Sequence, residues 1–181
     1  MKRNTKKLGI VLIYISFSLI LICFFNCNIS KNKKLDSKYS NYVGYINLDS
    51  ALITNRGKLC NPKKIFGTHH GLPEYAFEVS KKHFKTFIQN NYNNNNYDDS
   101  GYINFRFLIN CDGIAGWFEI IEMNLDLEEV ELNDEMVNQL LKLTYGYECW
   151  RQLSVMDKGS IDYYMYISYR IENGRITEIL P

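Results

Sequence analysis

The strongest constraint on the fold is an alternating stretch at residues 102–110 that is followed at once by a turn signal. Every second position in it is apolar, namely Ile103, Phe105, Phe107 and Ile109. A period of two is typical of a strand with one face buried. Asp112-Gly113 then supplies a favoured hairpin turn, so residues 116–123 are expected to return as a second strand. The pair predicts an antiparallel sheet.

Two further segments have helical spacing. Pro73 suits the first turn of a helix, and apolar residues then recur at Phe77, Phe84, Phe87 and Ile88, which predicts a helix to about Asn90. The second segment starts at Asn133, a good N-cap, with Asp134 and Glu135 in the first turn. Its apolar stripe is Met136, Val137, Leu140 and Leu143, and Gly146 suits its end.

A last pair of strands closes the chain. Residues 163–171 alternate again, and Asn173-Gly174 is a type I′ hairpin signal before residues 175–180. The predicted order is helix, strand, strand, helix, strand, short strand. Hairpin-paired strands covered by helices predict an α+β fold with two layers, a small antiparallel sheet with helices on one face.

The composition argues against several classes of function. The formal net charge is +1, so no strong field attracts nucleic acid, and no nucleic-acid partner is expected. The sequence has no Ser/His/Asp arrangement and no glycine-rich phosphate loop, so we expect no catalytic residues and no cofactor. The adjacent His69 and His70 point apart, and we expect no metal site there.

The N-terminus predicts a membrane attachment. Four basic residues precede an uncharged, mostly apolar run from Leu8 to Phe25, as in an export signal. One interpretation is an uncleaved anchor. The other is a lipoprotein signal cut before Cys27, which would then be acylated. Residues 1–27 are therefore a signal peptide or anchor, and residues 28–71 a polar, lysine-rich tether with a poorly defined N-terminal lobe. We expect the protein in the cell envelope, on the periplasmic side of a membrane.

Three cysteines belong to the body of the chain: Cys60, Cys111 and Cys149. Two of them can pair in an oxidising compartment. The predicted topology returns the second helix to the turn end of the hairpin, which places Cys111 and Cys149 at the same end of the domain. The sequence alone does not decide which two pair, and a disulfide between Cys111 and Cys149 is geometrically possible.

The order of these landmarks resembles a known family. Residues 101–113, Gly-Tyr-Ile-Asn-Phe-Arg-Phe-Leu-Ile-Asn-Cys-Asp-Gly, are similar to the strand and turn motif of the C-terminal domain of TonB-like energy transducers. Trp150 after the second helix, Gly159, and the aromatic strand at residues 162–171 follow in the family's order. The resemblance covers residues 72–181. It implies a periplasmic domain whose last long strand binds an extended peptide of an outer-membrane receptor by strand addition.

The exposed face of that last long strand is the predicted partner-binding surface. Tyr164, Tyr166, Ser168 and Arg170 share one face by period, and exposed tyrosines often mark recognition sites. The alternative is that the tyrosines of this strand are core residues. The functional hypothesis is thus a membrane-tethered binding module with a protein or peptide partner. The second hypothesis is a structural or interaction lipoprotein with no energy-transducing role, because the chain has three Pro, none clustered, and no His in Leu8–Phe25.

Labelling with a clickable palmitate distinguishes the two N-terminal interpretations. A lipoprotein predicts that label is incorporated in the wild type and disappears in Cys27→Ala, with the protein in the outer-membrane fraction. An uncleaved anchor predicts no label in either protein and full-length chain in the inner membrane. Label that persists in Cys27→Ala would contradict acylation at Cys27.

Overall fold

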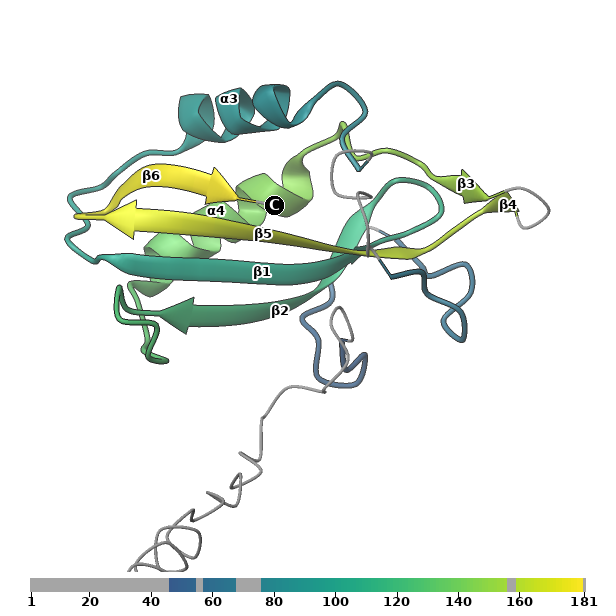
Figure 1. Cartoon of the computed structure of the whole chain (residues 1–181), viewed down its shortest axis with the longest axis horizontal. Helices are drawn as coiled ribbons and strands as arrows, with labels where there is room; N and C mark the ends of the chain where they lie inside the picture. The colour runs from purple at the N-terminus through teal and green to yellow at the C-terminus, as the bar shows by residue number, and fades with distance from the viewer. Residues whose placement is uncertain (1–45, 55–56, 68–75, 156–158, 181) are drawn as a thin grey trace, which may run out of the picture. The chain divides into compact units, whose positions relative to one another are not determined.

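The computed structural model describes residues 46–54, 57–67, 76–155 and 159–180 (Figure 1). Contacts divide the chain into residues 1–39 and 40–181, and all described residues belong to the second unit. Four predicted features lie outside the described residues: the signal or anchor, the possible acylation at Cys27, the histidine pair and the helix start at Pro73. Within the described ranges, no helix is both long enough and apolar enough to cross a membrane.

The centre of the domain is a four-stranded antiparallel sheet. Its order is β2 (Ala115–Met123), β1 (Gly101–Ile109), β5 (Tyr163–Glu172) and β6 (Arg175–Leu180) (Figure 1). Together with two helices, this sheet makes a small α+β fold, as predicted. The β1–β2 and β5–β6 hairpins are confirmed within one residue of their predicted bounds. A two-residue pair, β3 (Ser154–Val155) with β4 (Gly159–Ser160), was not predicted.

The second helix begins where the sequence predicts, and the first does not. Helix α4 spans Asp134–Gly146, and the Asn133 side chain accepts hydrogen bonds from two backbone N–H groups in its first turn. Helix α3 spans Lys81–Asn91 and is capped by the Ser80 hydroxyl, which accepts from the N–H of His83 at 3.1 Å. The prediction of a helix through Phe77 was wrong, because Phe77 forms a bridge with Trp150 instead.

One face of the sheet carries the main core. The odd-numbered residues of β1 and β5 point to it and are buried, as their alternation predicts. Both helices contribute to the same cluster, α3 through Phe84 and Ile88 and α4 through Met136 and Leu140. Trp150 lies among the aromatic rings of Phe77, Phe84, Phe107 and Tyr147. The helices therefore cover this face.

Part of the opposite face is covered by the segment that precedes α3. Ile46 and Ala51 pack with Leu108 of β1 and Trp117 of β2 in a second, smaller cluster. A bulge in β2 makes this feasible, because Phe107 lies opposite two neighbouring residues, Trp117 and Phe118. Trp117 packs in the small cluster, and Phe118 packs in the main core. Residues 46–54 and 57–67 thus belong to the same compact unit as the sheet.

The turn between β5 and β6 is held by the asparagine-rich segment after α3. Asn173 and Gly174 both have positive φ, 50° and 67°, as a type I′ turn requires. Gly174 donates to the Asp99 carbonyl at 2.8 Å, and the Tyr92 hydroxyl donates to the Gly174 carbonyl at 2.8 Å. A side chain at position 174 would collide with the Tyr97 backbone. The turn therefore requires glycine for two reasons, its conformation and its close neighbour.

Gly174→Ala is expected to lower the free energy of unfolding by about 2–4 kcal/mol, because it adds left-handed strain and a backbone collision. Gly146→Ala is the matched control, since nothing lies within 4 Å of a Cβ built at that position in α4. Alanine there is expected to be neutral or stabilising by up to about 1 kcal/mol. Urea denaturation of both variants measures the difference, and equal midpoints would contradict the role of the turn.

Candidate functional site

An open sheet has two edge strands, and in this domain one edge is closed. Phe118 of β2 exchanges two backbone hydrogen bonds with Leu52, both 2.9 Å. Further along β2, the Glu122 carbonyl accepts from the N–H of Val130 at 3.2 Å, and its carboxylate accepts from Leu132 at 2.7 Å. Flanking segments thus pair with the outer side of β2 at both ends, which leaves little room for another strand.

Among the described residues, nothing pairs with the other edge, which is the outer side of β6. Within the described part of the chain, no backbone hydrogen bond joins it to another segment. The Tyr164 N–H donates to the Phe66 carbonyl, on the side of β5 away from β1. Even-numbered peptide groups of β5 therefore point to the side on which β6 pairs. In the antiparallel pairing, Ile179 and Ile176 lie opposite odd-numbered residues, so their peptide groups point outward. Such unpaired groups are a template for another strand.

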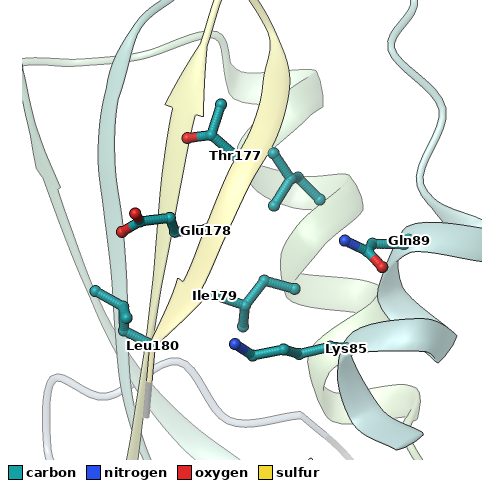
Figure 2. A pocket seen from close by; sticks show the side chains of 7 residues that line it. Lys85, Gln89, Thr177, Glu178, Ile179 and Leu180 are labelled. Atoms are coloured by element: carbon teal, nitrogen blue, oxygen red, sulfur yellow. The ribbon is translucent and has the colours of Figure 1, made fainter. Parts of the chain in front are cut away.

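A groove runs along this edge between β6 and α3. It has a volume of about 310 Å³ and is lined by Lys85 and Gln89 of α3 and by residues 176–180 of β6. Figure 2 shows Lys85 beside Ile179, and Glu178 on the other side of the strand. The groove places one helix alongside the open backbone. An extended peptide bound there would have β6 on one side and α3 on the other.

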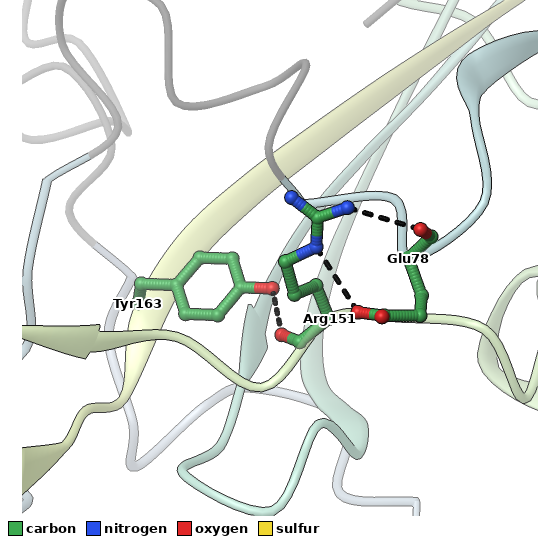
Figure 3. A network of polar contacts seen from close by, with 3 residues as sticks. All are labelled: Glu78, Arg151 and Tyr163. Carbon is green, nitrogen blue, oxygen red and sulfur yellow. Dashed lines mark hydrogen bonds and ion pairs between the residues drawn. The ribbon is translucent and has the colours of Figure 1, made fainter.

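The start of α3 is held against β5 by a polar network around Arg151 (Figure 3). The Arg151 guanidinium contacts the Glu78 carboxylate at 3.0 Å and donates to the Glu78 carbonyl at 3.0 Å. The Arg151 N–H donates to the Ala76 carbonyl at 2.8 Å, and the Tyr163 hydroxyl donates to the Arg151 carbonyl at 2.7 Å. Because residues 76–80 lead into α3, this network positions the helix wall of the groove.

Tyr92 and Tyr147 add hydrogen bonds around the same helix. Burial raises the pKa of Tyr92 to about 12, with smaller contributions from Tyr97 and Asp99. Burial also raises the pKa of Tyr147 to about 12, and its hydroxyl lies 2.8 Å from Nδ1 of His83. Both phenols therefore stay protonated at neutral pH, so these contacts hold α3 and the chain after it without introducing charge.

The predicted surface on β5 lies on the face away from the helices, but most of it is engaged. Tyr164 is half-buried against the small cluster, and the Ser168 hydroxyl donates to the side chain of Asn104. Arg170 pairs with Glu172 at 2.8 Å and with Glu178 at 3.8 Å. Tyr166 is the exposed member, with 43% of its surface accessible. The expectation that Tyr164 is exposed on this face was therefore wrong.

The edge that the family resemblance implied is also occupied. Strand β5 pairs with β1 from Tyr163 to Ile171, and with β6 from Ser168 to Glu172. A peptide cannot pair with that part of β5, since β6 already does. Strand addition in this chain would use β6, the strand created by the Asn173-Gly174 turn.

The structure pairs Cys111 with Cys60, so the predicted Cys111–Cys149 disulfide was wrong. The Cα atoms of Cys60 and Cys111 are 6.1 Å apart, and Cys149 is a free thiol. The reason is a buried carboxylate: Asp162 accepts from the N–H groups of Cys60, Asn61 and Cys111 at 3.2, 2.7 and 2.9 Å. These bonds bring the loop at residues 60–61 against the β1–β2 turn, which local sequence patterns did not indicate.

Cys60, Cys111 and Asp162 also form the single cluster of three potential metal-ligating groups within the described ranges. The two sulfur atoms are bonded to each other in the disulfide, and the Asp162 oxygens accept hydrogen bonds from backbone N–H groups. A metal ion needs deprotonated, free ligands. The chemistry of this cluster is therefore structural, a cross-link between the N-terminal segment and the sheet.

Comparison with known proteins gives no relative: no family model, no curated protein and no solved structure matches this chain.

Peptide mapping under non-reducing conditions is expected to recover one cross-linked pair, Cys60 with Cys111, and to find Cys149 alkylated. Because the bridge closes a loop of 51 residues, Cys60→Ser is expected to lower the free energy of unfolding by about 2–4 kcal/mol. Cys149→Ser is the matched control and should have a much smaller effect. Recovery of a Cys111–Cys149 peptide would contradict the pairing.

Proposed function

We propose that this chain is a membrane-tethered, non-enzymatic binding module of the cell envelope, and that it binds an extended protein segment by strand addition at β6. The observation that carries the proposal is the open outer side of β6 beside the groove to α3. Main-chain hydrogen bonds to Ile176 and Ile179 would supply affinity, and side-chain contacts in the groove would supply selectivity.

Two features favour an envelope location. The Cys60–Cys111 disulfide is typical of an oxidising compartment, since cytosolic thiols are kept reduced. The basic N-terminus and the apolar run after it are typical of export. The bound segment would then come from another envelope protein. An outer-membrane receptor is the partner that the resemblance to the TonB C-terminal domain suggests.

The order of elements supports a TonB-C-like domain as the finer description of the fold. A helix, a hairpin, a second helix and two closing strands follow one another over residues 81–180. In such a domain the partner segment would join the sheet. Here it would join as a fifth strand, beyond β6.

A second candidate function is a structural or interaction lipoprotein that uses the uncovered part of the sheet face and has no energy-transducing role. Tyr166 favours it, because it is a large, exposed aromatic side chain on that face. The charges around it are already paired: Arg106 contacts Glu119 at 3.2 Å, and Arg170 contacts two glutamates. Such a face would suit a neutral partner surface.

Site-specific photo-crosslinking in cells separates the two candidates. The photoreactive residue p-benzoyl-phenylalanine is introduced singly at Thr177, at Tyr166, or at Thr86, an exposed control on α3. Strand addition predicts an adduct from Thr177 and none from Thr86. The adduct is expected to map to one extended segment of the partner by mass spectrometry.

The other outcomes discriminate as well. An adduct from Tyr166 in the absence of one from Thr177 would favour the face and overturn the edge proposal. No adduct from either position, in protein that is folded and membrane-associated, would contradict a binding role for both surfaces.

A further inference from the structure

Among the described residues, the Lys85 ammonium in the groove beside β6 has no partner of opposite charge. Lys85 lines the groove from α3 and is half-buried, which is typical of a lysine whose aliphatic stem packs on a neighbour while its ammonium reaches outward. Among the described residues, no carboxylate lies within ion-pair distance of Lys85. The groove therefore presents a positive group beside an unpaired backbone edge.

Glu178, the acidic residue among the described residues that line the groove, does not neutralise this charge. Glu178 points to the opposite side of β6 from Lys85 (Figure 2), and its carboxylate lies 3.8 Å from Arg170. The two charges of the groove thus belong to different faces of the sheet. A bound strand alternates its side chains between those faces, so each of its residues meets one environment or the other.

The helix-side environment is apolar apart from Lys85 and Gln89. Ile179 is buried on this side, and Ile176 packs partly against the main core. Side chains of a bound strand that point toward α3 would extend this apolar surface. One of them would lie within reach of the Lys85 ammonium, where water is partly excluded and an ion pair is stronger than at a free surface.

We infer that the β6–α3 groove selects an extended segment with an acidic side chain opposite Lys85 and apolar side chains at the other positions that face α3. This inference rests on the proposed strand addition at β6 and names the chemistry of its partner. The pairing fixes the register of the added strand, because a shift by one residue would move the carboxylate to the face that carries Glu178.

A peptide series tests the inference on the full chain in detergent micelles. The probes are fluorescent, acetylated and amidated heptapeptides of alternating threonine and valine, in which one position at a time is aspartate, asparagine or lysine. Binding is measured by fluorescence anisotropy at low and at physiological salt. At one position, aspartate is expected to bind about fivefold more tightly than asparagine, and the difference should shrink as salt rises.

Three variants assign the preference to Lys85. Lys85→Gln is expected to abolish the difference between aspartate and asparagine, and Lys85→Glu to reverse it in favour of lysine. Lys82→Gln is the matched control, because Lys82 lies on the same helix, is exposed and does not line the groove. It removes the same charge from the protein and should leave the preference unchanged.

The failures of the two proposals are distinguishable. Peptides that bind with no preference for aspartate, or with a preference that Lys85→Gln leaves intact, would overturn the inference and leave strand addition standing. No binding by any peptide would overturn both. Self-association of the chain, seen by light scattering and increased by Lys85→Gln, would mean that a second copy occupies the edge and that Lys85 guards against it, and would also overturn the inference.

Discussion

The pairing of β1 with β5 is the interaction on which the rest of the domain depends. The two strands are joined in an unbroken register from Gly101–Ile171 to Ile109–Tyr163. This register turns the odd residues of both strands to one face, where they bury Phe105, Phe107, Tyr163 and Tyr169 under two helices. Because β1 and β5 are central, β2 and β6 are the edge strands of the sheet.

The two edge strands differ in how far their outer backbone groups are paired. Leu52 and Val130 pair with the outer side of β2, and the Cys60–Cys111 disulfide, together with the buried Asp162 carboxylate, anchors the loop at residues 60–61 to the β1–β2 turn. These contacts close one side of the sheet. Strand β6 is short, has a bulge opposite Arg170 and is flanked by α3. Within the described residues, its outward peptide groups are unpaired.

Local patterns predicted most of the elements but not how they meet. The alternation in β1 and β5, the Asn133 cap and the Asn173-Gly174 turn each depend on a few neighbouring residues, and each is confirmed. The start of α3 was wrong because Phe77 pairs with Trp150, a contact across 73 residues that helical spacing cannot reveal. The disulfide was wrong for the same reason: its partners are brought together by Asp162, 51 residues from Cys111 and 102 from Cys60. The open edge followed only from the complete strand order.

Hydrogen exchange of the β6 amides, followed by NMR on the full chain in micelles, tests the central claim most directly. A free edge predicts that the amides of Ile176 and Ile179 exchange quickly while those of Glu178 and Leu180, which face β5, are protected. Saturation with a strand-forming peptide should then protect the first pair. Slow exchange of Ile176 and Ile179 in the protein without peptide would mean that the edge is already closed, and unchanged fast exchange at saturation would mean that the peptide does not join the sheet.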